Sequence, residues 1–207
     1  MRRFLILYLL TSSALFSSCA VKTVKGLEAK TPKVTTYPVT YFSNLETDYV
    51  YKAHIAIYGK DFGGIFIAKK VNDTLYRAAF TTEFGNKLFD FEITDDSFKV
   101  NYILEELDRK IIVNTLKRDF MLLLKTKYNV AQQYEDDKDI IYKCSDGGRY
   151  NYLFVNKDNG RLSKIVNATK SKEKIVVNFN EENNILAKNI VIDHKNIKLK
   201  ITLNYIQ

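Results

Sequence analysis

From Tyr49 to the end of the chain, apolar and polar residues alternate with a period of two in one segment after another. In the last segment, Leu199 and Ile201 lie on one side of an extended backbone, and Lys198 and Lys200 lie on the other. This pattern predicts strands with one apolar and one solvated face. A long one-sided sheet must bury its apolar face by curling, by packing on a second sheet or by closing over a helix.

Turn-forming residues separate the alternating segments at intervals of roughly eight to twelve positions. The predicted strands, about eleven in all, are Tyr49–Tyr58, Gly64–Lys70, Thr74–Thr82, Lys87–Ile93, Phe98–Tyr102, Ile140–Cys144, Arg149–Asn156, Arg161–Asn167, Lys174–Phe179, Leu186–Ile192 and Ile197–Tyr205. These strands do not alternate regularly with helices. We therefore expect one antiparallel, curved sheet rather than a parallel one.

One helix is predicted in the middle of the chain, over Glu105–Lys125, a segment without Gly or Pro. Leu116 and Phe120 belong to an apolar stripe with helical spacing, and the charged residues fall mainly on the other side. The run from Phe120 to Leu124 is apolar almost all round, so we expect this end of the helix to be buried on several sides.

The N-terminus has the features of a secretory signal. Arg2 and Arg3 precede a short apolar run, which is far below the roughly 20 residues that a bilayer-spanning helix needs. The segment Phe16–Cys19 resembles a lipobox, in which small residues precede a cysteine that becomes lipidated, although Phe16 stands where the motif usually has Leu, Val or Ile. We therefore predict a lipoprotein signal peptide over residues 1–18 and lipidation at Cys19; plain secretion is the alternative.

Residues 19–47 are predicted to form an extended tether, because the segment is rich in Lys and Thr and holds both prolines of the chain, Pro32 and Pro38. Residues 48–207 form the predicted folded domain. No acidic cluster follows Cys19, which favours a lipid-anchored protein of the outer membrane that faces the periplasm.

Several other classes of function are disfavoured by composition and motifs. Removal of Arg2 and Arg3 with the signal lowers the formal charge from +8 to +6, but no basic stripe is present, so nucleic acid is a poor candidate partner. Cys144 would be the one remaining cysteine and is expected to be a buried apolar residue, which leaves no disulfide. His54 and His194 have no partners at metal-ligand spacing, and the acidic cluster Glu135–Asp139 lacks a calcium-loop glycine. We expect no metal, no cofactor and no enzymatic activity.

The order of these elements resembles the LolA/LolB family of lipoprotein carriers, in particular outer-membrane receptors of the LolB type. The matching stretch is Tyr76–Gly85, followed by the strand from Leu88 to Ile93, and the closing segment Ile197–Lys200 is also similar. The resemblance implies an incomplete antiparallel barrel whose helices cover a hydrophobic cavity for acyl chains. Glu83 stands where the family usually has proline, and the N-terminal helix of LolB has no counterpart in the sequence pattern.

The resemblance also implies roles for individual residues. By position, Phe84 matches the exposed hydrophobic residue that the family uses to deliver lipoproteins into the membrane. Phe62, in a glycine-containing turn, is a second candidate for a membrane-inserting loop. Residues predicted to line the cavity are Ile55, Ile57, Phe89, Phe91, Phe98, Leu116, Phe120, Tyr152, Phe154, Leu199 and Ile201. From the pattern alone, such residues are more often part of an ordinary core than the wall of a ligand cavity.

The predicted function is therefore to bind the acyl chains of lipoproteins or lipids and to insert them into the outer membrane. The predicted partners are that cargo, a periplasmic carrier protein and the outer membrane, and the chain is expected to be a monomer. One alternative is a structural lipoprotein that holds a protein partner on the same curved sheet. An acyl hydrolase is a more distant alternative, because no nucleophile and base can be paired in this sequence.

Overall fold

The computed structural model describes residues 21–183 and 185–206. Within these residues the chain forms a mainly β structure with one α-helix and one short 3-10 helix. The elements are η1 (Lys22–Val24), β1 (Thr36–Pro38), β2 (Asp48–Ile57), β3 (Lys60–Lys70), β4 (Tyr76–Thr81), β5 (Lys87–Ile93), β6 (Phe98–Ile103), α2 (Lys110–Leu123), β7 (Lys127–Glu135), β8 (Asp139–Asp146), β9 (Arg149–Asn156), β10 (Leu162–Ala168), β11 (Glu173–Glu181), β12 (Ala187–His194) and β13 (Leu199–Tyr205). In this part of the chain no helix has both the length and the apolar character needed to cross a bilayer.

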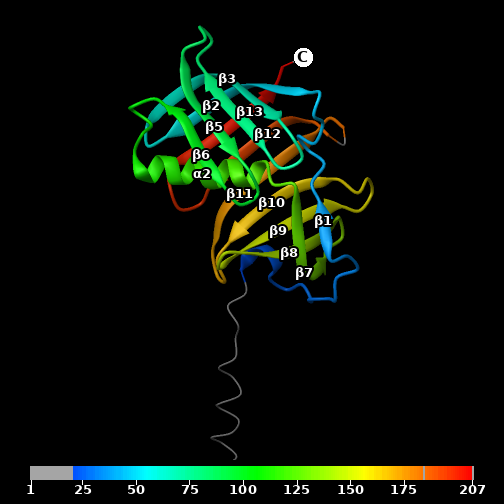
Figure 1. Ribbon diagram of the computed structural model, residues 1–207. Coiled ribbons are helices and arrows are strands. Elements are labelled where there is room, and N and C mark those ends of the chain that lie inside the picture. Colours follow the sequence, from blue (N-terminus) through cyan, green and yellow to red (C-terminus); the bar gives the residue numbers. More distant parts are fainter. Residues whose placement is uncertain (1–20, 184, 207) are drawn as a thin grey trace, which may run out of the picture.

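All of these strands belong to one sheet with the order β1-β7-β8-β9-β10-β11-β12-β13-β2-β3-β4-β5-β6. Every pairing is antiparallel. Two meanders, β2–β6 and β7–β13, are therefore joined where the last strand pairs with β2 (Figure 1). The edges β1 and β6 do not pair with each other, so the sheet is a half-open barrel, as predicted.

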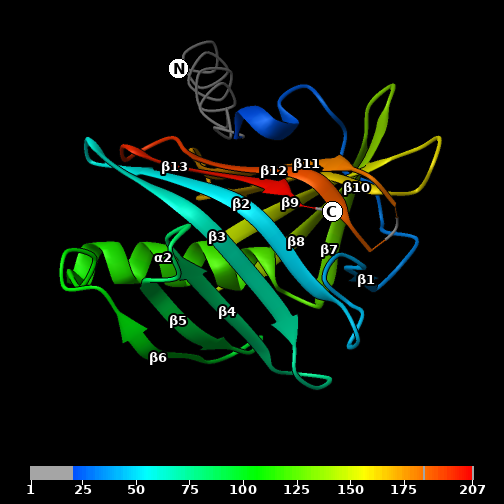
Figure 2. The same ribbon diagram turned by 90° about the horizontal axis from the view of Figure 1, so that it is seen from above.

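The predicted alternation is visible in the burial of each strand. In β13, Leu199, Ile201 and Leu203 are buried, whereas Lys200 and Asn204 are exposed. All eleven predicted strands are present. Apolar side chains of β2–β6 and of β11–β13 belong to the main core. Figure 2 shows α2 on the concave side of the sheet, with the strands curving around it.

Two strands were not predicted. β7 is polar along much of its length and even buries Gln133, so its sequence lacks clear alternation. β1 contains Pro38 and lies at the sheet edge, where the missing backbone N–H of proline is tolerated. The predicted helix also begins late, at Lys110, because residues 104–108 form turns.

The predicted extended tether is wrong for the described part of residues 19–47. Val21 and Val24 are buried, β1 pairs with β7, and Tyr41 and Phe42 belong to the main core. The segment is ordered because its apolar side chains cover apolar surface that the sheet would otherwise expose. The predicted signal peptide and Cys19 lie outside the described residues.

The N-terminal segment covers a second apolar cluster, on the other face of β7–β11. Its buried members are Val21, Val24, Tyr134, Ile141, Tyr152, Phe154, Val166, Ala168 and Val176. Tyr152 and Phe154 therefore do not share the concave face with the other predicted lining residues, and this part of the prediction is wrong. Both faces of β9 are apolar, and it is Leu153 and Val155 that join the main core.

Candidate functional site

The candidate site is the contact between α2 and the concave face of the sheet. Leu116, Phe120 and Leu123 follow one another at helical spacing and are each no more than 1% exposed. Of the predicted lining residues, Ile55, Ile57, Phe89, Phe91, Leu199 and Ile201 are buried in the same cluster, and Phe98 packs against it while partly exposed. The structure thus brings nine of the eleven predicted side chains to one apolar surface.

Aromatic rings fill the middle of this surface. The ring of Phe120 stacks on that of Phe66, with centroids 5.2 Å apart, and lies 5.3 Å from the Phe89 ring. Phe89 and Phe91 stack in turn with centroids 4.4 Å apart, and Phe91 contacts Phe98 at 4.7 Å. The C-terminal half of the helix therefore packs against a cluster of aromatic rings on β3, β5 and β6, which we call the aromatic nest.

An apolar hollow remains at the N-terminal end of the helix. It has a volume of about 110 Å³ and lies between Ile57, Phe62, Leu107 and Ile112, with charged residues at its rim. An engineered cavity of about 150 Å³ is known to hold one benzene molecule. The hollow is therefore too small for an acyl chain while α2 keeps this position.

A buried ionisable pair, which the sequence pattern did not reveal, also fixes the helix. The carboxylate of Asp119 on α2 lies 2.8 Å and 3.0 Å from Nε2 of His194, at the end of β12. The Asp119 side chain is 0% exposed and that of His194 is 3% exposed. Burial raises the pKa of Asp119, and the contact with His194 opposes that rise. His194 was predicted to be structural, and it holds the helix to the sheet.

The N-terminal end of α2 is held less firmly. No side chain caps the helix at Arg109, and its first turn has no acidic residue. The preceding turn is held by the exposed ion pair between Lys60 and Glu106, with Nζ and Oε2 2.9 Å apart. Exposed pairs of this kind contribute little to stability. The helix is thus fixed by its middle and C-terminal half, while its N-terminal connection is the weaker one.

The β4–β5 loop presents Phe84 to solvent. Phe84 is 93% exposed, the highest value among the exposed large hydrophobic residues of the described chain. The loop is closed by hydrogen bonds from Thr82 N to Asn86 O at 2.8 Å and from Gly85 N to Thr82 O at 3.0 Å. Gly85 has a φ of +85°, which glycine adopts without strain. A defined turn therefore holds the aromatic ring away from the core.

Phe62 is not at a loop tip. It lies within β3, pairs with Ile55 of β2 and packs against the main core while partly exposed. The turn between these strands is made instead by Tyr58 and Gly59, both with positive φ. The prediction that Phe62 stands at a loop tip is therefore wrong, and its side chain borders the small apolar hollow instead.

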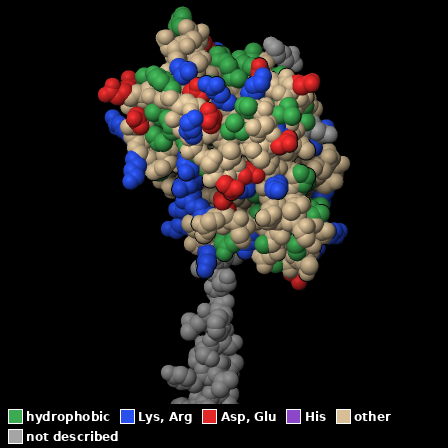
Figure 3. Space-filling model, in the orientation of Figure 1, with side chains coloured by type: hydrophobic (Ala, Val, Ile, Leu, Met, Phe, Trp, Pro, Cys, Tyr) green, Lys and Arg blue, Asp and Glu red, His purple; other side chains and the backbone are tan. Residues whose placement is uncertain are grey.

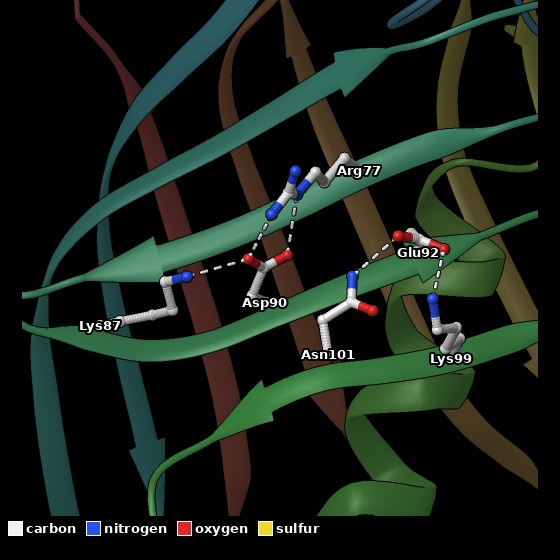
Figure 4. A network of polar contacts seen from close by, with 6 residues as sticks. All are labelled: Arg77, Lys87, Asp90, Glu92, Lys99 and Asn101. Atoms are coloured by element: carbon white, nitrogen blue, oxygen red, sulfur yellow. Dashed lines mark hydrogen bonds and ion pairs between the residues drawn. The ribbon is translucent and has the colours of Figure 1, made fainter.

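Arg77, from the stretch that resembles the carrier family, has a structural partner. Its guanidinium donates two hydrogen bonds to Asp90 at 3.0 Å and 2.7 Å, and Lys87 donates a third at 3.1 Å (Figure 4). Glu92 accepts from Lys99 and Asn101 on the next strand. These contacts lie on the face of β4–β6 opposite to the aromatic nest and tie the strands that carry the Phe84 loop.

The remaining candidates have no shared site. Cys144 is buried, and burial raises its pKa to about 12, so its thiol is unreactive near neutral pH. His54 is exposed and lies 3.0 Å from Asp61. Asp136 in the acidic cluster accepts hydrogen bonds from the backbone of its own turn. Within the described ranges no three His, Cys, Asp or Glu side chains are placed to hold a metal ion.

Comparison with known proteins supports the fold. No family profile and no curated protein matches the chain. Among solved structures, the LolA superfamily protein NE2245 from Nitrosomonas europaea is similar, with a TM-score of 0.53 and 11% identity over 82% of this chain and 88% of that one. The chain therefore has the fold of a LolA superfamily protein.

Two further structures are more distant. A DUF1329 family protein from Desulfovibrio piger has a TM-score of 0.43 and 8% identity over 80% of this chain and 87% of that one. A domain named for outer membrane lipoprotein sorting, from Vibrio parahaemolyticus, has a TM-score of 0.46 and 8% identity over 77% of this chain and 83% of that one.

Proposed function

We propose that this chain is a lipid-anchored protein of the outer membrane that binds the acyl chains of lipoproteins or lipids between α2 and the concave face, and releases them into that membrane. The observation that carries the proposal is a large apolar sheet face covered by α2, in a fold shared with a LolA superfamily protein. Transport of this kind needs no covalent chemistry, and we propose that the protein is not an enzyme.

The energetic reason for such a carrier is the cost of exposing acyl chains to water. Each methylene that leaves water contributes roughly 0.8 kcal/mol, so a long acyl chain left in water would cost about 12 kcal/mol. An apolar face that accepts the chain removes most of this cost. Cargo would move toward the site that shields it best, and the membrane is the final such site.

Loading requires α2 to move, because the apolar hollow of about 110 Å³ is too small for an acyl chain. We expect the helix to separate first at its uncapped start at Arg109, because its C-terminal end is held by the hydrogen bond from Tyr128 to the Leu122 carbonyl. An acyl chain that replaced Phe120 in the aromatic nest would regain the apolar contacts that the helix loses.

The position of the N-terminal segment constrains how an anchor and the Phe84 loop act together. The 3-10 helix η1, dark blue in Figure 1, lies at the end of the molecule opposite to the β4–β5 loop. Cys19 precedes Val21 by two residues. For Phe84 to enter the membrane that holds a lipid at Cys19, the segment with Val21 and Val24 must leave its place on the sheet and act as the tether.

The test is the substitution Phe84→Glu, which places a charge on the exposed loop without touching the core. We expect the variant to fold normally, to bind lipid, and to transfer lipoproteins to the outer membrane at least about tenfold more slowly, since a carboxylate at the tip opposes insertion into an apolar phase. Phe84→Leu should retain most of the transfer. Val71→Glu, in the loop between β3 and β4 and 50% exposed, is the matched control for an added surface charge. Normal lipoprotein localisation with Phe84→Glu would contradict the assigned role.

The alternative, a scaffold that binds a protein partner, is favoured by one observation. The aromatic nest fills the concave face with the protein's own side chains. A photo-crosslinking residue in place of Phe91 or Ile201 separates the two functions. Adducts with acylated molecules support a carrier, whereas adducts with one protein alone support a scaffold.

A further inference from the structure

A polar groove lies beside α2, on the side of the helix that faces the β8–β9 turn. Its volume is about 420 Å³. Its lining residues come from α2 and the connections at its end, from the β8–β9 turn and from β9 and β10. They are Asp95, Asn114, Lys117, Arg118, Met121, Leu122, Lys125, Asp146, Gly147, Arg149, Asn151 and Asn167. A second hollow of about 470 Å³ adjoins it, because both are bordered by Asn114, Arg118 and Arg149.

The groove carries an excess of positive charge. Lys117, Arg118, Lys125 and Arg149 line it against two carboxylates, and the second hollow adds Lys110. Figure 3 shows Lys and Arg side chains gathered on this side of the molecule, beside and below the helix.

The two carboxylates of the groove accept hydrogen bonds from neutral groups. Asp95 accepts hydrogen bonds from the backbone and hydroxyl of Thr126 at 3.1 Å and 2.8 Å, and Asp146 accepts from Asn151 at 3.1 Å. None of the lining cations forms an ion pair with a residue in the described part of the chain. With four cations and two carboxylates in its lining, and with Lys125 lying 5.5 Å from the centroid of the Tyr128 ring, the groove keeps a net positive charge.

Buried amides form the floor of the groove and hold one cation in place. Arg149 donates to Asn167 at 2.9 Å, and Asn167 donates to Asn151 at 2.7 Å. Both asparagines are 1% exposed. Only one of the five N–H groups of the guanidinium is used in this chain of hydrogen bonds, so the others remain available to a ligand. Burial lowers the pKa of Arg149 and the positive charge of Arg118 lowers it further, while the carboxylate of Asp146 opposes this shift.

We propose that this groove binds the phosphate of an anionic lipid headgroup, so that the preferred cargo is a phospholipid whose acyl chains enter beneath α2. This inference rests on the proposed function and gives it a substrate class. A phosphate offers several acceptor oxygens, and the planar donors of Arg118 and Arg149 suit it better than they suit an uncharged headgroup. Met121 and Leu122 border the groove, so a headgroup bound there would place its chains next to the apolar side of the helix.

The experiment measures lipid capture by the purified mature chain. Vesicles of phosphatidylcholine are doped with phosphatidylglycerol or, in a separate set, with uncharged diacylglycerol, and protein-bound lipid is counted by mass spectrometry after the vesicles are removed. The test variant is Lys117→Gln/Arg118→Gln, in which both residues are exposed on α2. The control is Lys172→Gln/Lys188→Gln, which removes the same charge at exposed positions outside the groove.

We expect the wild-type protein to capture more phosphatidylglycerol than diacylglycerol. The test variant should capture about tenfold less phosphatidylglycerol than the wild-type protein, and the same amount of diacylglycerol. The control should behave as wild type. Equal capture of both lipids by the wild-type protein, or equal losses in both variants, would overturn the headgroup site while leaving the carrier function intact. Capture of neither lipid, nor of an acylated peptide, would overturn the proposed function itself.

A third arm distinguishes the two sources of phosphate. Inorganic phosphate and glycerol 3-phosphate are titrated into the lipid-free protein by calorimetry. Weak binding of both, with capture of phosphatidylglycerol retained in millimolar phosphate, supports a lipid headgroup. Tight binding of inorganic phosphate without a preference between the two lipids would overturn the lipid assignment and show a site for a soluble phosphate.

Discussion

Asp119 is a carboxylate buried where water cannot solvate it, and the imidazole of His194 is its hydrogen-bond partner. A buried charge that loses its partner is costly, typically by about 3–5 kcal/mol. His194→Leu should therefore lower the free energy of unfolding at pH 7 by about this amount, measured by urea denaturation. Burial raises the pKa of Asp119, so protonation of this carboxyl group favours the folded state. The stability lost in His194→Leu should therefore become smaller as the pH falls toward the raised pKa of Asp119.

The matched variant for this pair is Asp119→Leu/His194→Leu. Replacement of a buried polar pair by apolar residues is often neutral or stabilising, so the double variant should recover most of the lost stability. If the double variant were as unstable as His194→Leu, the cost would come from a change in packing and not from an unpartnered carboxylate.

Asp90 shows the opposite shift. The hydrogen bonds from Arg77 lower the pKa of Asp90 to about 2, and Lys87 adds to this effect. A carboxyl group with a lowered folded-state pKa stabilises the fold above its ordinary value near 4, and this contribution is lost as the pH falls from about 4 to about 2. The contribution is on the order of 2 kcal/mol. Arg77→Gln should reduce stability at pH 6 and flatten the decline between pH 4 and pH 2 in urea titrations. A variant with the wild-type acid profile would contradict this account.

At the scale of the strands, β3 has to pass unusually close to its neighbour. A side chain added at Gly64 would place its Cβ 1.9 Å from the carbonyl oxygen of Thr81, whereas a Cβ at Gly63 would meet nothing within 4 Å. Gly64→Ala should therefore lower the melting temperature by several degrees, because backbone must shift, and Gly63→Ala should leave it nearly unchanged. Equal effects from both substitutions would show that the close approach of β3 and β4 is not needed for the fold.

The sequence allowed the strands to be predicted where apolar and polar residues alternate strictly, as from Leu199 to Asn204. It did not predict the inward face of β9, because Tyr152 and Phe154 are as apolar as Leu153 and Val155. Periodicity cannot choose between two apolar faces. That choice depends on a covering segment, here with Val21, which is distant in the sequence.

The site was predictable only in part for a similar reason. The exposed Phe84 follows from a local turn, and local turns can be recognised from a few neighbouring residues. The Asp119–His194 pair and the chain of hydrogen bonds that holds Arg149 join residues that are far apart in sequence or lie on different strands. Such contacts exist only once the sheet has formed, so no sequence spacing indicates them.

In the whole molecule, the sheet does not depend on α2 for its hydrogen bonds. The two meanders meet at the β13–β2 pairing, and all ladder bonds run between strands. The helix contributes apolar packing, the buried Asp119–His194 pair and a buried hydrogen bond from the Tyr128 hydroxyl to the Leu122 carbonyl, all of which can be broken while the strands stay paired. A molecule built this way can open its apolar face by moving one element.

Loading with an acyl chain should therefore loosen the helix and leave the sheet unchanged. Hydrogen exchange followed by mass spectrometry should show faster exchange across Lys110–Leu123 in the lipid-loaded chain than in the lipid-free chain, and equal exchange in β12, β13 and β2. Phe120→Ala should raise exchange in the helix without lipid, because it removes the ring that seats the helix in the aromatic nest. If lipid bound while hydrogen exchange in α2 stayed the same or slowed, the acyl chain would have to bind elsewhere on the protein. The reason is that the apolar hollow beside the helix has a volume of only about 110 Å³ when the helix stays in place.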